Sequence, residues 1–477
     1  MKEYDLIVIG TGSAMNIVDA MLRDNPKMKV AVIDKDEPGG ICLTRGCIPS
    51  KILLYPSELV RLIEKANELG VQTKINRIEF SKIMQRMRRL IDEDIEAIRD
   101  GLSTSENIDY YPNAAEFVAP YTLKAGKETI HSKMIFLCTG SQTIIPRVSG
   151  LEEAGYLTSD TVFRLRELPE SLVIVGGGYI AAEFGHFFAT MGSRVTIMGR
   201  NSRFLPEEEP EVSALAKREL GRHMTILTNH EVTEAGRAPG GQKRVVGVNS
   251  GNGQRVEITA TQILVAVGRG PTSDILHPER AGIATDEKGW LKVNDYLEST
   301  QPNVWVIGDA DGRYPFKHVA NYESEVVYYN AVLKQKTRVD YHAIPHAVFT
   351  YPEIASVGLK EDEAVRELGK KEVLVGFYKY EDTAKGEAMA VKDYFVKVLI
   401  HRSSNKILGA HIIGSYASIL IQEIINLMYT EEQSASIMLR AIHIHPALNE
   451  TVQRAFQSLT TVDAYHHVLE HQLGLRI

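Results

Sequence analysis

Short apolar runs that end in glycine recur along the first two thirds of the chain. Leu6–Ile9 is followed by Gly10-Thr11-Gly12, then by a helix-compatible stretch, and then by a second apolar run, Val30–Ile33, which ends at Asp34. This order of strand, glycine turn, helix, strand and acid is typical of a dinucleotide-binding βαβ unit.

The same order returns in the middle of the chain. Leu172–Val175 precedes Gly176-Gly177-Gly178, a helix-compatible stretch Tyr179–Thr190 and a further apolar run, Val195–Met198. Two such units in one chain predict two dinucleotide sites.

The remaining pattern predicts further elements around these units. Residues 56–101 carry apolar positions at helical spacing and predict one or two long helices. Further strands are expected at Met134–Gly140, Ile263–Val267 and Val304–Ile307. From about residue 338, strand runs alternate with amphipathic helices, which indicates a separate α+β domain. The polar, His-rich stretch 465–477 is expected to be a surface helix or disordered.

Composition narrows the class of protein. A chain of 477 residues predicts about three domains at roughly 150 residues each. A net charge of −7 without a Lys/Arg run disfavours nucleic acid as a partner. We expect no membrane span, because no apolar stretch reaches ~20 residues. The N-terminus runs directly into a strand-like segment, so we expect no signal peptide and a cytoplasmic protein.

Cysteine is scarce, and two of the three cysteines are close in sequence. Cys42 and Cys47 are five residues apart, whereas Cys138 lies in a predicted buried strand. Scarcity argues against a structural disulfide framework, and pairing points to redox or metal chemistry. Zinc sites usually combine two ligand pairs, and the chain has no second cysteine pair, so we expect no metal.

The segment between the two cysteines constrains their geometry. On a regular helix, residues five apart are separated by at least five rises of ~1.5 Å, which exceeds the ~4.4–6.8 Å between the Cα atoms of a disulfide. We therefore predict that Cys42 lies on an irregular lead-in and Cys47 near the start of a helix, with the bend at Gly46. Pro49 suits a first helical turn. A helix N-terminus should lower the pKa of Cys47.

The glycine turns are expected to hold the phosphates of the dinucleotides. Glycine lets the backbone approach a pyrophosphate, and the helix N-terminus supplies N–H groups and partial positive charge. The residues that fit this pattern are Gly10, Gly12 and Asp34 in the first unit and Gly176, Gly178 and Ala181 in the second. Met15 occupies the third glycine position of the first unit, and we expect it to widen the helix–strand contact.

The residues after the second unit bear on the nucleotide. An NAD-preferring site would place an acid after Val195–Met198 to hold the ribose 2′-hydroxyl. This chain has Arg200 and Arg203 there instead, and arginine can hold a 2′-phosphate bidentately. We predict a preference for NADPH over NADH; the alternative is that both arginines are ordinary surface cations.

Together these motifs resemble the pyridine nucleotide-disulfide oxidoreductase family. The resemblance covers nearly the whole chain, and its segments are both glycine turns, Cys42–Lys51, Thr139-Gly140-Ser141, Gly268–Pro271, Gly308-Asp309, Phe349–Glu353 and His445–Glu450. It implies two Rossmann-like domains, an FAD domain made of residues 1–148 and 271–337 and an NAD(P) domain of residues 149–270. Residues 338–477 would form an α+β interface domain of a homodimer.

The resemblance also implies a role for each site residue. Cys47 would face the flavin as its charge-transfer partner, and Cys42 would exchange with a small thiol or disulfide substrate. Lys51 would lie near the flavin nitrogen, paired with Glu183. His445, oriented by Glu450, would act as acid and base toward Cys42 of the other subunit. The implied FAD residues are Gly10, Gly12, Asp34, Lys51, Ala115, Thr139, Gly140 and Asp309, and the implied NAD(P) residues are Gly176, Gly178, Ala181, Arg200, Arg203 and Gly268.

The sequence is compatible with several activities. One is a dihydrolipoamide dehydrogenase, for which a lipoyl-domain protein is a candidate partner. Another is an NADPH-dependent reductase of a low-molecular-weight disulfide, of the mycothione or glutathione reductase kind. A third is a flavoprotein that binds without turnover, against which the full set of site residues argues. Thr44-Arg45 replaces the usual Asn-Val of the family, and the chain lacks the C-terminal cysteine pair of mercuric reductase.

Overall fold

The first glycine turn lies at the end of a central strand of a five-stranded parallel sheet. The structure, a computed structural model that describes residues 1–472, orders these strands as β19 (Val304–Val306), β8 (Ile135–Leu137), β2 (Leu6–Ile9), β3 (Val30–Ile33) and β4 (Ile108–Tyr111). The first four of these strands are continuous apolar runs because both faces of the sheet are covered, whereas the edge strand β4 contains Asp109.

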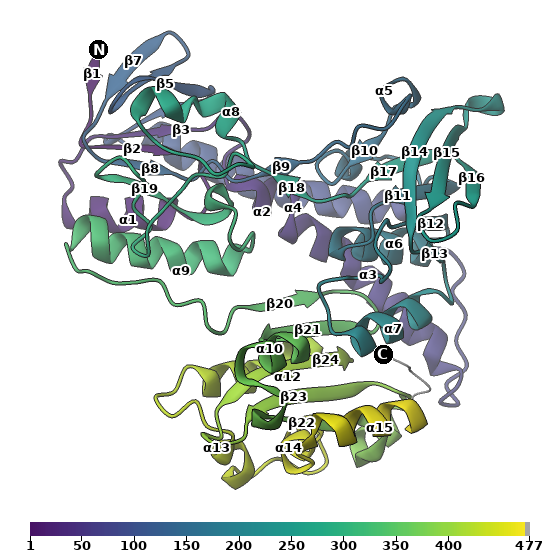
Figure 1. Ribbon diagram of the computed structural model, residues 1–477. Helices are drawn as coiled ribbons and strands as arrows, with labels where there is room; N and C mark the ends of the chain where they lie inside the picture. Colours follow the sequence, from purple (N-terminus) through teal and green to yellow (C-terminus); the bar gives the residue numbers. More distant parts are fainter. Residues whose placement is uncertain (473–477) are drawn as a thin grey trace.

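Successive side chains along each strand point to opposite faces of the sheet. Leu6 and Val8 pack against helices α1 (Met15–Asp24) and α9 (Lys317–Val327). Ile7 and Ile9 pack toward a four-stranded sheet in the order β1 (Lys2–Glu3), β7 (Glu128–His131), β6 (Thr122–Ala125) and β5 (Ala115–Ala119). In Figure 1 this body occupies the upper left.

A second parallel sheet contains the second glycine turn. Its strand order is β10 (Leu157–Thr158), β17 (Gln262–Val265), β11 (Ser171–Val175), β12 (Arg194–Met198) and β13 (Thr225–Leu227). Helix α6 (Tyr179–Met191) covers one face, and an antiparallel meander covers the other, made of β14 (His230–Arg237), β15 (Lys243–Asn249) and β16 (Arg255–Ala260). The predicted repeat of the βαβ unit is thus confirmed, and the overall α/β fold class with it.

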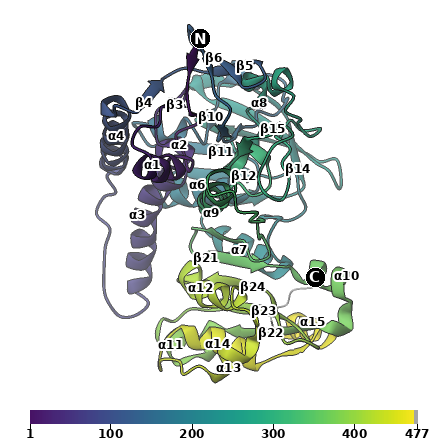
Figure 2. The same cartoon turned by 90° about the vertical axis from the view of Figure 1, so that its left-hand side faces the viewer.

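Two long helices lie between the two βαβ units, where one or two were predicted. They are α3 (Cys47–Ala66) and α4 (Phe80–Thr104). Figure 2 shows α3 running down one side of the molecule. The sheets themselves are joined by a short antiparallel pair, β9 (Gln142–Thr143) with β18 (Arg269–Gly270).

The last part of the described chain builds a six-stranded antiparallel sheet. Its strand order is β20 (Pro345–Val348), β21 (Glu353–Gly358), β24 (Ile407–Gly414), β23 (Phe395–His401), β22 (Val373–Lys379) and β25 (Thr460–Thr461). Its helices are α10 (Glu361–Leu368), α11 (Ala384–Ala388), α12 (Ala417–Met428), α13 (Ala435–Arg440), α14 (Asn449–Gln457) and α15 (Val462–Gln472). This agrees with the predicted α+β character after residue 338.

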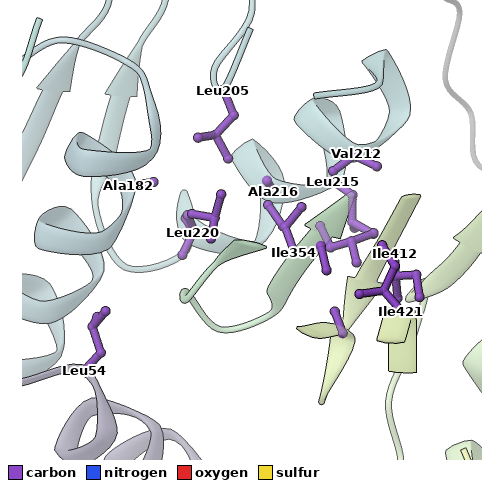
Figure 3. Close-up of a cluster of buried hydrophobic side chains, with 14 of the residues drawn as sticks. Leu54, Ala182, Leu205, Val212, Leu215, Ala216, Leu220, Ile354, Ile412 and Ile421 are labelled. Atoms are coloured by element: carbon purple, nitrogen blue, oxygen red, sulfur yellow. The ribbon is translucent and has the colours of Figure 1, made fainter. Parts of the chain in front are cut away.

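Helix α7 (Pro210–Leu220) joins the second sheet to the antiparallel one. Figure 3 shows Val212 and Leu215 of α7 near Ile354, Ile412 and Ile421 of the C-terminal sheet and α12. All five side chains belong to one buried cluster. Apolar contact of this kind fixes the C-terminal body against the second nucleotide-binding body.

The predicted geometry around the cysteines needs one correction. Cys42 lies in a short helix, α2 (Gly40–Arg45), and not on an irregular lead-in. The chain then breaks at Gly46, and α3 begins at Cys47. A Cβ at position 46 would lie 2.7 Å from the carbonyl oxygen of Ile41, so only glycine fits the break. The bend at Gly46 and the place of Pro49 in the first turn of α3 are as predicted.

The C-terminal stretch also differs from its prediction in part. It is helical as α15, but Tyr465 and Leu469 are buried, so the helix has an apolar face that the polar, His-rich composition concealed. The Tyr465 hydroxyl donates a hydrogen bond of 2.6 Å to Oε1 of Glu211 on α7. The prediction for residues 473–477 lies outside the described residues. Within residues 1–472, no helix has the length and apolar character that crossing a bilayer requires.

Candidate active site

A cleft of about 2620 Å³ brings both glycine turns and the cysteine pair together. A pocket for one small ligand usually measures about 300–1,000 Å³, so the cleft has room for more than one. Among the residues predicted to bind FAD, its walls include Gly10, Gly12, Asp34, Lys51, Ala115, Thr139, Gly140 and Asp309.

The first glycine turn fits the phosphates of a dinucleotide. Gly10 has φ 106°, and a Cβ there would lie 2.1 Å from the carbonyl oxygen of Cys138. Oδ2 of Asp34 accepts hydrogen bonds from the amide (2.9 Å) and the hydroxyl (2.6 Å) of Thr11, which orients the carboxylate at the end of β3. Met15, the first residue of α1, packs half-buried against the core, so the turn keeps its strand–helix setting without a third glycine.

The second glycine turn has the same construction. Gly176 has φ 131°, and a Cβ there would lie 2.1 Å from the carbonyl oxygen of Ala266. Ala181 is fully buried on the inner face of α6, whereas Gly176, Gly178 and Gly268 line the cleft. A small residue at position 181 permits close packing of helix on strand.

The two arginines that were predicted to bind the nucleotide differ in their position relative to the cleft. Arg200 lines the cleft, but Arg203 is exposed and is not among the cleft-lining residues. Glu207 also lines the cleft, although the residues directly after β12 contain no acid. The loop after β12 therefore presents one cation and two carboxylates to the cleft, and the second carboxylate, Glu208, is bonded to His346 and Ser356.

The two cysteines are free thiols in contact with one another at the junction of α2 and α3. A hydrogen bond from Cys42 lowers the pKa of Cys47 to about 7, and the charge of Lys51 acts in the same direction, while enclosure in the cleft opposes both. The same hydrogen bond, together with burial, raises the pKa of Cys42. One proton shared between two sulfurs therefore resides on Cys42 and leaves Cys47 as the thiolate.

Lys51 and Glu183 form an ion pair beside this thiolate. Nζ of Lys51 lies 3.0 and 2.9 Å from Oε1 and Oε2 of Glu183, across the packing of α3 on α6. Oε1 also accepts the backbone N–H of Phe349 at 3.0 Å, and the Lys51 ammonium lies 4.7 Å from the centre of the Phe349 ring. The C-terminal body thus helps to orient an ion pair whose two members, Lys51 and Glu183, belong to the two nucleotide-binding bodies.

His445 and Glu450 lie together but apart from the cysteines of their own chain. Nδ1 of His445 is 3.0 and 3.1 Å from the two carboxylate oxygens of Glu450, and this contact lowers the pKa of Glu450. The His445 side chain is 72% exposed, and neither residue lines the cleft. In Figure 1, α13 and α14, which flank His445, lie at the far end of the C-terminal body from α2.

A polar network in the cleft connects residues that the sequence motifs contained only separately. The Ser141 hydroxyl donates to Asp309 (2.6 Å) and accepts from Nε of Arg269 (2.7 Å), and Arg269 also faces Asp160 at 3.7 Å. Arg45, from the segment between the cysteines, pairs with Asp36 at 2.6 Å. The segments Thr139-Gly140-Ser141, Gly268–Pro271 and Gly308-Asp309 indicated three of these residues, but the bonds between them join positions far apart in the sequence.

Family models and related proteins match this chain over most of its length. Residues 4–324 match the model described as pyridine nucleotide-disulphide oxidoreductase, and residues 344–456 match the dimerisation domain of the same name. Mycothione reductase of Mycobacterium tuberculosis (strain ATCC 25618 / H37Rv) is 34% identical over 471 residues, which cover 96% of this chain and 100% of the relative. Dihydrolipoyl dehydrogenase of Chlamydia muridarum is 31% identical over 479 residues, which cover 98% of each.

Solved structures show the same similarity. The HOCl-induced flavoprotein disulfide reductase RclA from Escherichia coli superposes with a TM-score of 0.83 at 26% identity, covering 95% of this chain and 99% of that one. Its Cu(II) complex superposes with a TM-score of 0.84 at 27% identity, covering 96% and 99%.

Proposed function

The chain belongs to the pyridine nucleotide-disulphide oxidoreductase family, and from that premise we propose that it is an FAD-dependent enzyme that reduces a small disulfide with NAD(P)H through Cys42 and Cys47. The observation that carries this proposal is the hydrogen-bonded thiol pair in a cleft shared with two glycine turns. FAD, when bound, would pass an electron pair from the nicotinamide to the disulfide form of the two cysteines.

The different roles of the two sulfurs follow from their different protonation states. Cys47 holds the thiolate, stabilised by the proton of Cys42 and the charge of Lys51, so it suits the role of partner to the flavin. Cys42 holds the proton and needs a base before it can attack a substrate sulfur. Attack by Cys42 breaks the substrate disulfide and releases one thiol, and attack by Cys47 on the mixed disulfide releases the second and leaves Cys42–Cys47 oxidised.

We propose that the base is His445 of a second subunit in a homodimer. Glu450 orients the imidazole, and the exposed side chain is available to a partner. Exposed apolar residues surround this segment, with Ile442 at 100% and Ile444 at 75% exposure, and others lie on α3, with Tyr55 at 59%. Apolar patches of this kind mark interfaces, and residues 344–456 match a dimerisation domain.

The nucleotide preference is proposed from the loop after β12. Arg200 in the cleft supports NADPH, while Glu207 in the same lining is the carboxylate through which NADH would be preferred. The ratio of kcat/KM for the two nucleotides tests this directly. Arg200→Ala should raise KM for NADPH by about tenfold and leave KM for NADH nearly unchanged. A wild-type ratio that favours NADH would end the proposal.

We favour a low-molecular-weight disulfide as the substrate, because Arg200 points to NADPH and a mycothione reductase is 34% identical over 96% of the chain. A dihydrolipoyl dehydrogenase activity, with a lipoyl-domain protein as partner, is the second candidate, since such an enzyme is 31% identical over 98% of the chain. The remaining alternative is a flavoprotein that binds without turnover.

One substrate panel separates these three. The purified protein is assayed with lipoamide, cystine-type disulfides and other thiol disulfides, each with NADH and NADPH, beside Cys42→Ser and Cys47→Ser variants. Turnover of one disulfide that both variants abolish supports the proposal and identifies the branch. Equal nucleotide oxidation by wild type and variants would show that the cysteines carry no disulfide chemistry.

A further inference from the structure

Lys317 is a cleft residue for which no motif predicted a role. It is the first residue of α9, half-buried, and its ammonium donates a hydrogen bond of 2.8 Å to the hydroxyl of Ser13. Ser13 directly follows the first glycine turn and in turn donates to Oδ1 of Asn321 (3.0 Å), one helical turn beyond Lys317. The start of α9 is thereby tied to the phosphate-binding turn of the first sheet.

This position is unfavourable for a cation in the protein alone. The start of a helix carries partial positive charge and repels a lysine. Burial lowers the pKa of Lys317, and the groups that act against this are the thiols Cys42, Cys47 and Cys138, with no carboxylate among them. Lys51, the other lysine near the sulfurs, has its charge met by Glu183. Within residues 1–472, Lys317 thus faces the cleft without a carboxylate counter-ion.

We propose that Lys317 is an FAD-binding residue whose ammonium ion neutralises the diphosphate of the cofactor at the Gly10–Ser13 turn. The diphosphate is the anion expected there, because Gly10 and Gly12 line the cleft and the hydrogen bond of Lys317 is to Ser13 of that turn. The negative charge of the Cys47 thiolate is already stabilised by the hydrogen bond from Cys42 and by the charge of Lys51. This inference rests on the proposed function, since it requires that FAD binds in the cleft.

The test measures FAD binding, not turnover. Apoprotein of the wild type and of the Lys317→Met, Lys317→Arg and Lys27→Met variants is titrated with FAD by flavin fluorescence. Loss of a charge-assisted hydrogen bond should raise the Kd of Lys317→Met about 10- to 100-fold. Lys317→Arg keeps the charge and should stay within about threefold, and Lys27→Met, an exposed lysine beyond α1, should match the wild type.

Stability and salt give two further readouts that a merely structural lysine would not produce. Removing an uncompensated cation should leave apo Lys317→Met at least as stable as the wild-type apoprotein, while FAD raises its Tm by less. Added NaCl should weaken FAD binding more in the wild type than in Lys317→Met. An apo variant that is clearly less stable than wild type would assign Lys317 a structural role and overturn the inference.

The failures of this inference and of the proposed function are distinguishable. Equal Kd values for wild type and Lys317→Met would overturn the inference alone. The same holds if Kd is unchanged and the pH dependence of alkylation of Cys42 or Cys47 shifts instead, because the charge of Lys317 would then act on the thiols and not on the cofactor. A wild-type protein that binds no FAD would overturn the proposed function and this inference together.

Discussion

The reactivity of the cysteine pair depends on which of the two sulfur atoms holds the proton that they share. Because the hydrogen bond from Cys42 lowers the pKa of Cys47 to about 7, the reduced protein should hold its thiolate above pH 7 and lose it below. The rate of Cys47 alkylation by iodoacetamide should therefore rise through a midpoint near pH 7. Cys42→Ala removes the donor and should move this midpoint upward, toward the ordinary thiol value of about 8.5.

The third cysteine supplies the control for this titration. Burial raises the pKa of Cys138, so that thiol should stay unreactive over the same pH range. Cys138→Ala should leave the Cys47 midpoint where it is. A midpoint that does not move in Cys42→Ala would mean that the low pKa arises from Lys51 and the helix, and not from the neighbouring thiol.

At the scale of elements, the break between α2 and α3 sets the approach of the two sulfurs. A Cβ at Gly46 would lie 2.7 Å from the Ile41 carbonyl oxygen and 3.2 Å from Cα of Cys42. Gly46→Ala should therefore push α2 away from the start of α3 and cost about 1–3 kcal/mol of unfolding free energy. Disulfide formation, followed by thiol titration after mild oxidation, should slow at least tenfold.

A glycine inside helix α4 provides the comparison. At Gly101, in α4, an added Cβ meets nothing within 4 Å, and the residue is exposed within a helix. Gly101→Ala should stabilise the protein slightly, by up to about 1 kcal/mol, and leave disulfide formation unchanged. If Gly46→Ala oxidises as fast as Gly101→Ala, the break in the backbone is not what brings the cysteines together.

Helix α15 is held to α7 by a buried hydrogen bond. Tyr465 is fully buried, and its hydroxyl donates to Glu211, which also accepts from Lys397 at 2.6 Å. Tyr465→Phe leaves Glu211 with one donor fewer and should lower the free energy of unfolding by about 1–3 kcal/mol, measured in urea. Tyr378→Phe, whose hydroxyl makes an exposed bond, should change it by less than about 0.5 kcal/mol.

The sequence predicted those elements whose cause is local. Both glycine turns, their strands and the helix beginning near Cys47 follow from apolar runs and from residues that only a turn or a helix start requires. The helical state of Cys42 was missed because α2 has only six residues, fewer than two turns, and so short a stretch shows no helical periodicity. The buried face of α15 was missed because Tyr465 has its partner 254 residues away.

The same limit applies to the site. Cys42, Cys47, Lys51 and both glycine turns were predicted as catalytic or cofactor-binding residues, and they line the cleft together. Lys317 was not found, since no sequence pattern shows that α9 begins beside Ser13. Nor does the pattern after β12 show that Glu207 and Glu208 line the cleft whereas Arg203 does not. Long-range packing decides these positions.

For the whole molecule, the proposed role of His445 predicts an active site shared between subunits, because His445 lies apart from the cleft of its own chain. His445 is exposed and paired with Glu450, whereas Cys42 lies in the cleft. In a twofold dimer each site would then take Cys42 from one subunit and His445 from the other. His445→Ala and Cys42→Ser homodimers should each lose nearly all disulfide turnover, by at least about 100-fold.

Mixing the two inactive variants tests this arrangement. After dissociation and random reassociation, about half of the dimers contain one subunit of each kind, and each such dimer has one intact site and one doubly defective site. The mixture should therefore recover about a quarter of the wild-type activity per subunit. If His445 served the Cys42 of its own chain, no dimer would contain an intact site and the mixture would stay inactive. Native mass spectrometry of the mixture confirms that mixed dimers have formed, so an inactive mixture that contains them contradicts the shared site.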